Sequence, residues 1–358
     1  MINFTVGPVQ SEESVRAIGA EQVPYFRTAE FSSTMLENEK LILEFAHAPK
    51  DSRAVFITGS GTASMEATVM NVLHTDDKVL VVNGGSFGER FVELVKLHDI
   101  PYEEIKLQAG ETLTEKHLEK YENMPFTAFL VNLHETSTGV LYDVELIKSF
   151  CLRNRLLLIV DAISCFLAEP IDMEKQFIDV LITGSQKALA CPPGISVIAL
   201  SPTALKRVEE TPVKCMYLNL KSALKNGERG QTPFTPAVGI LNQINLRLRN
   251  IKKNGGVESE IEKVRSLAEY FRLRLTNLPL KAFAKTPSSA VTALETINVS
   301  AYDVFVTLKD EYGIWVCPNG GELKDKVFRV GHIGDLSFND YDKLLDALND
   351  LVKRGILK

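Results

Sequence analysis

The sequence predicts an α/β protein with two domains. A large domain would hold a mostly parallel, mixed sheet between layers of helices, and a small α+β domain would follow it. Strand-like and helix-like segments alternate over the first two hundred residues, which is typical of parallel sheets. The strand-like segments are short apolar runs, as expected for strands covered on both faces. With 358 residues, the chain is also too long for one compact core.

The expected strands of the large domain are Ala54–Thr58, Lys78–Asn83, Pro101–Lys106, Phe126–Asn132, Leu156–Asp161, Val180–Thr183 and Ile195–Leu200. The helices between them are expected at Thr62–Leu73, Ser86–His98, Thr114–Tyr121 and Asp143–Arg153. Ligands of such sheets bind beyond the carboxyl ends of the strands. The loops that directly follow strands are therefore where a site is expected.

The rest of the chain divides differently. We expect irregular structure at Lys221–Pro236 and helical structure from about 238 to 278, with a break at Asn254-Gly255-Gly256. The small domain is expected to contain strands at Val291–Val299, Trp315–Cys317 and Val327–Val330 and helices at Tyr302–Tyr312 and Phe338–Arg354. We predict an arm at 1–20 that joins the small domain and the active site, a large domain at 21–245 and a small domain at 246–358.

Composition argues against several classes of function. The net charge is -6 and no long Lys/Arg cluster is present, so nucleic acid is not an expected partner. No apolar run is longer than a strand, and the N-terminus has no signal-peptide pattern, so we expect no membrane association. The five cysteines form no CxxC pair, which indicates reduced thiols in a cytoplasmic protein and no metal site.

A glycine-rich turn, Gly59-Ser60-Gly61-Thr62-Ala63-Ser64, joins the first strand to a helix. Unpaired N–H groups and the dipole at a helix N-terminus bind phosphate, and glycines allow a close approach. The alternative is a tight turn with Thr62 as the helix N-cap. A dinucleotide site is disfavoured, because Ser64 replaces the third glycine of that fingerprint and the next strand ends in Asn83.

Two charged residues follow other strands. Asp161 ends an apolar strand, where a carboxylate is costly to bury unless it meets a cation such as a protonated pyridine nitrogen. Lys187 follows the strand Val180–Thr183, and a lysine with a lowered pKa forms Schiff bases with aldehydes. The alternatives are a helix cap or a loop carboxylate for Asp161 and a surface position for Lys187.

Two further residues could complete a site. Phe87 follows a strand between glycines, so its ring could lie across a flat ligand instead of in the core. Arg329 precedes Gly331 in a strand and would suit bidentate capture of a carboxylate, unless it forms a salt bridge. A lysine, an acid, a phosphate turn, a stacking ring and an arginine are the parts that a pyridoxal phosphate site needs.

These motifs, in this order, resemble the class V aminotransferases, which are pyridoxal-phosphate enzymes of fold type I. Within that family, the closest resemblance is to the alanine–glyoxylate and serine–pyruvate group. The matching segments are GPV near the start, FRTAEF (26–31), GSGTASMEA (59–67), GGSFGER (84–90), HETSTGV (134–140), DAIS (161–164), TGSQKALACPPG (183–194), TPFTPAV (232–238) and FRVGHIGD (328–335).

The resemblance implies how the cofactor would be held. Lys187 would carry it, and Asp161 would pair with its pyridine nitrogen. Ile163 would pack under the ring, and Phe87 stands where the family often has a tryptophan stacked on the other face. The residues implied near the ring oxygen or the phosphate are Thr136, Gly61, Thr62, Ala63 and Gln186.

The resemblance also implies substrate contacts and a partner. Arg329 would bind the substrate α-carboxylate, and Gly7 would lie near the substrate. Thr235 would reach the phosphate of the neighbouring subunit, which implies a homodimer with active sites at the subunit interface. The aligned stretch around Thr235 matches loosely.

The implied reaction transfers an amino group from a donor of the alanine or serine type to glyoxylate or pyruvate. Lys187, once free, would move the α-proton as general base and acid. Three alternatives stay open. A 2-aminoethylphosphonate–pyruvate transaminase has a similar HETSTG segment. A cysteine desulfurase or lyase would need a mobile thiol, for which Cys317 is the only candidate near a glycine-rich loop. A binding protein could have kept the fold without the chemistry.

Overall fold

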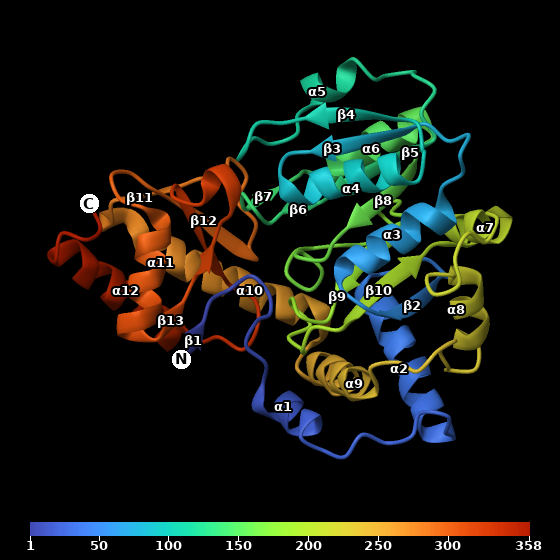
Figure 1. Ribbon diagram of the computed structural model, residues 1–358, viewed down its shortest axis with the longest axis horizontal. Helices are drawn as coiled ribbons and strands as arrows, with labels where there is room; N and C mark the ends of the chain where they lie inside the picture. The colour runs from blue at the N-terminus through green and yellow to red at the C-terminus, as the bar shows by residue number, and fades with distance from the viewer.

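The computed structural model describes residues 1–358 and shows two domains side by side, each built around its own sheet (Figure 1). The large domain holds a seven-stranded sheet, and the small domain, which contains the C-terminus, holds a four-stranded one. The boundary that we placed between residues 245 and 246 stays a prediction, and it falls inside helix α9 (Val238–Lys253). None of the helices is both long and apolar enough to cross a membrane.

The large sheet is mixed and mostly parallel, with the strand order β2-β10-β9-β8-β5-β3-β4. Only β10 runs antiparallel to its neighbours. The strands are β2 (Arg53–Thr58), β3 (Val79–Asn83), β4 (Tyr102–Lys106), β5 (Ala128–Asn132), β8 (Leu157–Asp161), β9 (Val180–Gly184) and β10 (Ile195–Leu200). The seven predicted strands are therefore all present, within two residues at each end.

Helices cover both faces of this sheet because the strands are apolar on both faces. In β5, Phe129 and Val131 enter one buried cluster, while Ala128 and Leu130 enter the other. The helices of the large domain are α2 (Ala29–Phe45), α3 (Gly61–Val72), α4 (Ser86–Leu97), α5 (Glu115–Glu119), α6 (Val144–Asn154), α7 (Pro202–Glu210), α8 (Leu220–Gly227) and α9. A short hairpin of β6 (His134–Glu135) and β7 (Val140–Leu141) follows β5.

The small domain has a third buried cluster, between its antiparallel sheet and its helices. Helix α10 (Gly256–Leu273) links the domains, since Val257 and Val264 belong to the large core and Leu267 and Phe271 to the small one. The other elements are η1 (Leu275–Asn277), β11 (Leu280–Ala282), β12 (Val291–Thr296), α11 (Ala301–Tyr312), β13 (Ile314–Trp315), β14 (Cys317–Pro318), η2 (Gly321–Leu323), β15 (Val327–Gly331) and α12 (Phe338–Lys353).

The N-terminal arm also spans the two domains. Its strand β1 (Ile2–Asn3) pairs with β13 of the small domain, and its helix α1 (Glu13–Gly19) packs against α9 of the large domain (Figure 1). The segment between these two elements is held against β15, because a Cβ on Gly331 would lie 2.6 Å from the carbonyl oxygen of Thr5. The arm thus crosses the space beyond the carboxyl ends of the large sheet.

One sequence prediction was wrong in part, because Lys221–Pro236 is not wholly irregular. Helix α8 occupies its first residues, where Asn219 caps the helix by accepting from the N–H of Ser222 and Leu220 is buried. Helices α1, α2 and α7 were not predicted either. The strand expected at Trp315–Cys317 is divided between β13 and β14, and the strand expected at Val291–Val299 ends at Thr296.

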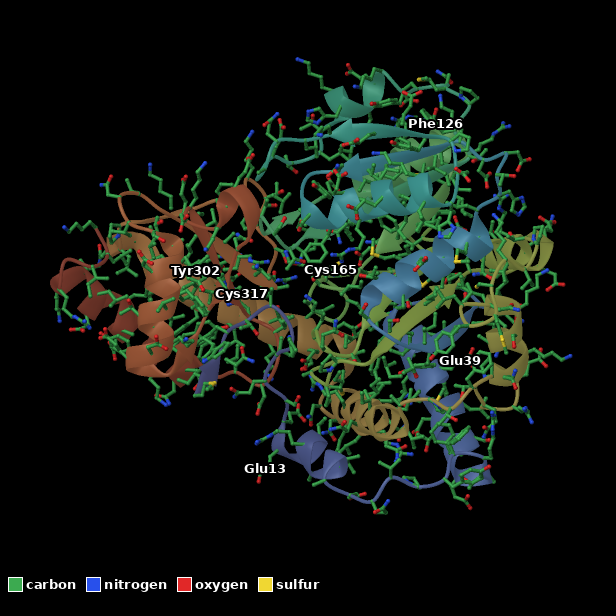
Figure 2. All side chains as sticks on the ribbon, in the orientation of Figure 1. Glu13, Glu39, Phe126, Cys165, Tyr302 and Cys317 are labelled. Atoms are coloured by element: carbon green, nitrogen blue, oxygen red, sulfur yellow. The ribbon has the colours of Figure 1, made fainter.

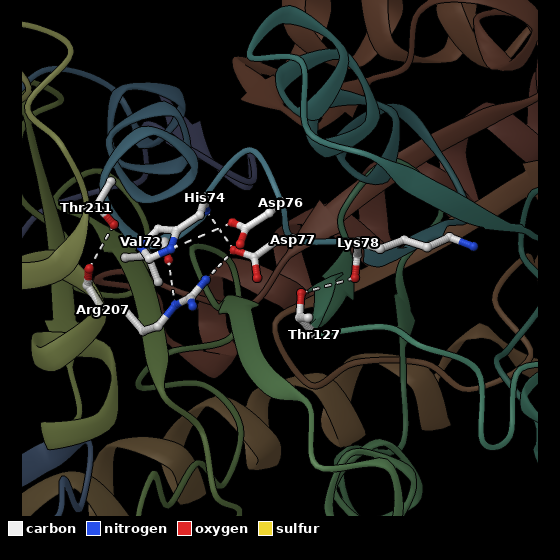
Figure 3. A network of polar contacts seen from close by, with 8 residues as sticks. All are labelled: Val72, His74, Asp76, Asp77, Lys78, Thr127, Arg207 and Thr211. Carbon is white, nitrogen blue, oxygen red and sulfur yellow. Dashed lines mark hydrogen bonds and ion pairs between the residues drawn. The ribbon is translucent and has the colours of Figure 1, made fainter.

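At the amino ends of the parallel strands, an ion pair joins α7 to the loop before β3 (Figure 3). The guanidinium of Arg207 pairs with the carboxylate of Asp77, and its Nε donates to the carbonyl oxygen of Val72 at 3.1 Å. Asp77 also accepts from the N–H of His74 at 2.6 Å. Every charged group in this network has an opposite charge or a strong donor.

Candidate active site

Lys187 lies in the loop after β9 and is held inside the protein by the N-terminal arm. Its side chain is buried, and its Nζ donates to the carbonyl oxygen of Val6 at 2.7 Å. A Cβ on Gly7 would lie 2.7 Å from Cδ of Lys187, and Gly7 has a φ of +130°. Any larger residue at position 7 would therefore both strain the backbone and displace the lysine.

The environment of Lys187 favours its neutral amine. Burial lowers its pKa to about 8, because an ammonium ion loses water inside the protein. The charge of Arg329 acts in the same direction on this pKa, while Cys317 and Asp161 act against it. Since no carboxylate forms an ion pair with Lys187, this amine is available for chemistry near neutral pH.

Asp161 ends β8 and is completely enclosed. Asn132, its register partner in β5, donates from Nδ2 to one carboxylate oxygen at 2.8 Å, and the N–H of Ile163 donates to the other at 2.9 Å. Burial nevertheless raises the pKa of Asp161 to about 6. An additional cationic or N–H partner would lower the cost of keeping this carboxylate ionised.

The glycine-rich turn lies beside the same loop. Helix α3 begins at Gly61, so Ser60 and not Thr62 occupies the N-cap position, and the Ser60 side chain caps no N–H group. A Cβ on Gly61 would lie 2.2 Å from Cδ1 of Ile163, so only glycine fits against that side chain. The N-terminus of α3 therefore lies against the loop of Asp161, and its N–H groups at Gly61 and Thr62 are available to an anion, while that of Ala63 donates to the carbonyl oxygen of Ser60 at 2.9 Å.

Phe87 is oriented by a residue that we did not single out from the sequence. The carboxylate of Glu135 accepts from the N–H groups of Phe87 at 3.2 Å and Gly88 at 3.0 Å, at the N-terminus of α4. A Cβ on Gly85 would lie 2.6 Å from Cδ of Glu135. The ring of Phe87 is half-buried, with the guanidinium of Arg90 over it at 5.1 Å.

Thr136 belongs to a buried polar group at the hairpin after β5. Its hydroxyl donates to Oγ of Ser164 at 2.7 Å. Nδ1 of His134 lies 3.3 Å from the carbonyl oxygen of Ser164 and must donate to it, which leaves Nε2 without a partner. Burial lowers the pKa of His134 to about 3, so the ring is neutral.

Arg329 reaches the site from β15 of the small domain. It donates to two carbonyl oxygens, from Nη1 to Thr136 at 3.1 Å and from Nη2 to Pro318 at 2.6 Å, while its buried Nε has no partner. It forms no salt bridge with any acidic side chain. Cys317, its register partner in β14, lies near the boundary between the domains (Figure 2). Arg329 is thus a buried cation without an anion.

The structure brings most of the predicted site residues together at one edge of the large sheet. Those gathered there are Gly7, Gly61, Thr62, Ala63, Phe87, Thr136, Asp161, Ile163, Gln186, Lys187 and Arg329. Thr235 is different, because it is exposed in the loop between α8 and α9. The residues that we missed are Asn132, His134, Glu135, Ser164 and Arg90. Asn132 could have been found, since it ends a predicted strand beside Asp161.

These residues fit pyridoxal phosphate. The buried amine, the enclosed carboxylate, the open helix N-terminus and the unpaired guanidinium each match one group of the cofactor or of an amino acid substrate. The glycines at positions 7 and 61 let the arm and the turn pack against Lys187 and Ile163, because a side chain at either position would collide with one of these two residues.

Residues 21–322 match the family described as aminotransferase class-V, and the chain belongs to this family. It is accordingly a pyridoxal-phosphate-dependent aminotransferase by class, with the fold type I architecture. Two similar sequences are a soluble hydrogenase 42 kDa subunit from Anabaena cylindrica and an uncharacterized aminotransferase from Helicobacter pylori. Both are 31% identical, over 93% and 98% of this chain and 88% and 95% of the relatives.

Solved structures show the same fold. An aspartate aminotransferase of subgroup IV from Thermus thermophilus superposes with a TM-score of 0.91 at 26% identity, covering 99% of both chains. An alanine–glyoxylate aminotransferase from Nostoc sp. also gives 0.91 at 25% identity, covering 98% of this chain and 95% of that one. At these identities, the similarity does not fix the substrates of this chain.

Proposed function

We propose that this chain is a cytoplasmic enzyme that transfers the amino group of a small amino acid, of the alanine or serine type, to glyoxylate or pyruvate. Pyridoxal phosphate would be held at Lys187. One observation carries this proposal: the buried amine of Lys187 has no ion-pair partner, although both the carboxylate of Asp161 and the guanidinium of Arg329 are near enough to influence its pKa. The similarity to the Nostoc alanine–glyoxylate aminotransferase supports the substrate pair.

Each residue would have a defined part in the reaction. The cofactor supplies an electron sink conjugated to the substrate Cα when it is bound. Asp161 would hold a proton at the ring nitrogen, and Arg329 would orient the substrate through its α-carboxylate. Lys187 Nζ, once free, would take the Cα proton and return it to the cofactor. The N-terminal arm, through Val6 and Gly7, would exclude water from Lys187.

The remaining cofactor contacts are proposed by position. Phe87 and Ile163 would lie on opposite faces of the ring, and Thr136 would donate near the ring oxygen. The phosphate would lie at the N-terminus of α3 and receive hydrogen bonds from the residues around that turn, namely Gly61, Thr62, Ala63 and Gln186.

Arg90 favours a second substrate class for the same reaction. Its guanidinium lies over Phe87, acts on the pKa of Lys187 and takes part in no ion pair. A cation so placed would suit an anionic group other than an α-carboxylate, such as the side-chain carboxylate of aspartate or the phosphonate of 2-aminoethylphosphonate. This observation keeps a 2-aminoethylphosphonate–pyruvate transaminase as the alternative.

We also propose that the enzyme is a homodimer with active sites at the subunit interface. Large apolar side chains are exposed in two segments, with Val23 and Tyr25 in one and Val213, Met216 and Tyr217 in the other. Exposed apolar groups that are close together commonly mark interfaces. Phe234, next to Thr235, stacks on Tyr217, so the second segment would carry Thr235 toward the phosphate of the other subunit.

Single-turnover half-reactions test the substrate class. The cofactor-loaded protein is mixed separately with alanine, serine, aspartate and 2-aminoethylphosphonate, and the colour change is followed. We expect alanine or serine to react fastest, and Arg90→Gln to leave these rates within about twofold. If the phosphonate reacts fastest and Arg90→Gln abolishes that preference, the alternative is correct, whereas a fastest reaction with aspartate would contradict both the proposed donor and the alternative. Reaction with none of the four would contradict the proposed substrates.

A further inference from the structure

A series of polar groups, all buried except the half-buried Arg272, connects the two domains near the strand that carries Arg329. We call it the boundary relay, and its members are Glu169, Ser288, Arg272, Thr292, His332 and Tyr341. None of these residues was assigned a role in the site. Buried polar groups are costly unless each is paired, so a continuous series of them indicates a requirement for order.

The relay begins in the large domain, in the loop that follows Asp161 and Ser164. The carboxylate of Glu169 accepts from the hydroxyl of Ser288 at 2.9 Å and from the N–H of Ser289. The carbonyl oxygen of Ser288 in turn accepts from Nη2 of Arg272 in α10. Ser288 therefore lies between an acidic side chain of one domain and a basic side chain of the linking helix.

Only one arrangement of protons satisfies the rest of the relay. The hydroxyl of Tyr341 donates to the carbonyl oxygen of Gly331 at 3.2 Å, so it accepts from Nδ1 of the neutral His332 at 2.9 Å. Nε2 of His332 therefore accepts from the hydroxyl of Thr292 at 2.7 Å, which itself accepts from Nε of Arg272 at 2.8 Å.

The arrangement requires a neutral histidine, and the surroundings keep it neutral. His332 is fully buried, and burial lowers its pKa well below the usual value, with a further contribution from the charge of Arg272. A second proton on Nε2 would face the proton of Thr292, so the relay has a fixed direction from Arg272 to Gly331.

The relay ends on the strand that carries Arg329. Gly331 is two residues further along β15, and Thr292 in β12 pairs with Val330, next to Arg329. The guanidinium of Arg329 contacts only carbonyl oxygens, one of which belongs to Thr136 in the large domain. Its direction therefore depends on where β15 lies relative to the large domain. The bond between Glu169 and Ser288 is one of the contacts that join the two, beside α10 and the N-terminal arm.

We propose that Arg272, Thr292 and His332 are positioning residues that set Arg329 at the distance from Lys187 that a substrate carboxylate requires. The inference rests on the proposed role of Arg329. It goes beyond that role by identifying side chains that hold the strand of Arg329 in place against the linking helix α10.

Thr292→Val removes the relay hydroxyl at nearly constant volume. Thr296→Val is the matched control, because Thr296 lies on the same strand, is also buried and bonds only to the carbonyl oxygens of Val299 and Lys326. We expect Thr292→Val to raise KM for the amino acid and the dissociation constant for glyoxylate about tenfold, with kcat changed by less than about threefold. Thr296→Val should change neither, and Thr292→Ser should restore wild-type values.

Hydrogen exchange on the full-length chain gives a readout that needs no activity. Thr292→Val should speed exchange at the amides of Val330 and Gly331, whereas Thr296→Val should not. If Thr292→Val fails to fold, Arg272→Gln is measured in its place. It removes the donor to Thr292 and should speed exchange at the same two amides. Equal exchange and equal glyoxylate affinity in the Thr292 and Thr296 variants would overturn the inference.

Borohydride reduction separates this inference from the proposed function. If the wild-type protein traps no cofactor at Lys187, the proposed function fails, and the exchange data alone decide on the relay. If the cofactor is trapped in every variant and Thr292→Val binds glyoxylate like the wild type, the relay has no positioning role.

Discussion

The two ends of the large sheet bury charge in opposite ways. At the amino ends of the parallel strands, Arg207 and Asp77 form an ion pair that backbone groups complete (Figure 3). At the carboxyl ends, Lys187, Asp161 and Arg329 are buried as well, but none of them forms an ion pair. At the amino ends the charged side chains neutralise each other, while at the carboxyl ends the charged side chains have no protein counter-ion and can bind a charged ligand.

This difference accounts for the pKa values of two groups at the site. Burial lowers the pKa of Lys187 to about 8 and raises that of Asp161 to about 6, because no opposite charge compensates fully for lost water. Shifts of this kind, gathered in one place, are typical of catalytic sites. A paired network serves stability, and removing one member should damage the fold without touching the chemistry.

The largest expected effect comes from removing the amine. Lys187→Ala should lower the rate of transamination by about three orders of magnitude or more, because the group that holds the cofactor and moves the proton is lost. Lys175→Ala, at a side chain that is 83% exposed, is the control and should keep the full rate. More than a tenth of the wild-type rate in Lys187→Ala would contradict the assignment.

Breaking the ion pair at the other end should affect stability instead. Asp77→Asn leaves Arg207 partly buried without its anion, and we expect a loss of about 2–3 kcal/mol in the free energy of unfolding. Urea denaturation measures this loss, and kcat should stay within about twofold of the wild type. A large fall in kcat with unchanged stability would mean that the two ends are not functionally distinct.

Cofactor association should depend on pH in the direction set by Lys187. Its pKa in the folded chain is about 8, below the ordinary 10.5, so the neutral amine forms as pH rises through 8. The association rate of pyridoxal phosphate with cofactor-free protein should therefore rise about tenfold between pH 7 and 9 and then level off. Stopped-flow absorbance measures it. If the association rate began to rise only near pH 10, Lys187 would have the ordinary pKa of a solvent-exposed lysine, which would contradict this prediction.

The smallest effect is expected at Cys317. It lies near the site but beside Arg329 in a paired strand, so it lacks the mobility that a desulfurase thiol needs. Cys317→Ala should change the transamination rate by less than about twofold, and the wild-type protein should release no sulfide from cysteine. Sulfide release that disappears in Cys317→Ala would support the lyase alternative.

The sequence predicted the parts of the fold that local patterns control. The seven strands of the large sheet were expected because apolar runs of this length recur between amphipathic segments, and Asp161 and Lys187 were expected at strand ends. The roles of these residues stay predictions until they are measured. Helix α8 was missed because LKSALKNG is lysine-rich and short, and its burial depends on packing against distant residues.

What could not be predicted arises from contacts between distant segments. Val6 accepts from Lys187 across 181 positions, and Glu135 fixes the N-terminus of α4 across 48 positions at Phe87. No local pattern carries such information. The boundary relay could not be predicted for the same reason, since His332 and Thr292 come into contact only when β12 and β15 are paired.

Borohydride reduction of the purified, coloured protein, followed by peptide mapping, tests the central claim most directly. The account predicts a single pyridoxyl group, attached to Nζ of residue 187, and no trapping in Lys187→Ala. A label on another lysine, or a protein that binds the cofactor without any reducible bond, would show that the unpaired charges at this end of the sheet serve a different purpose.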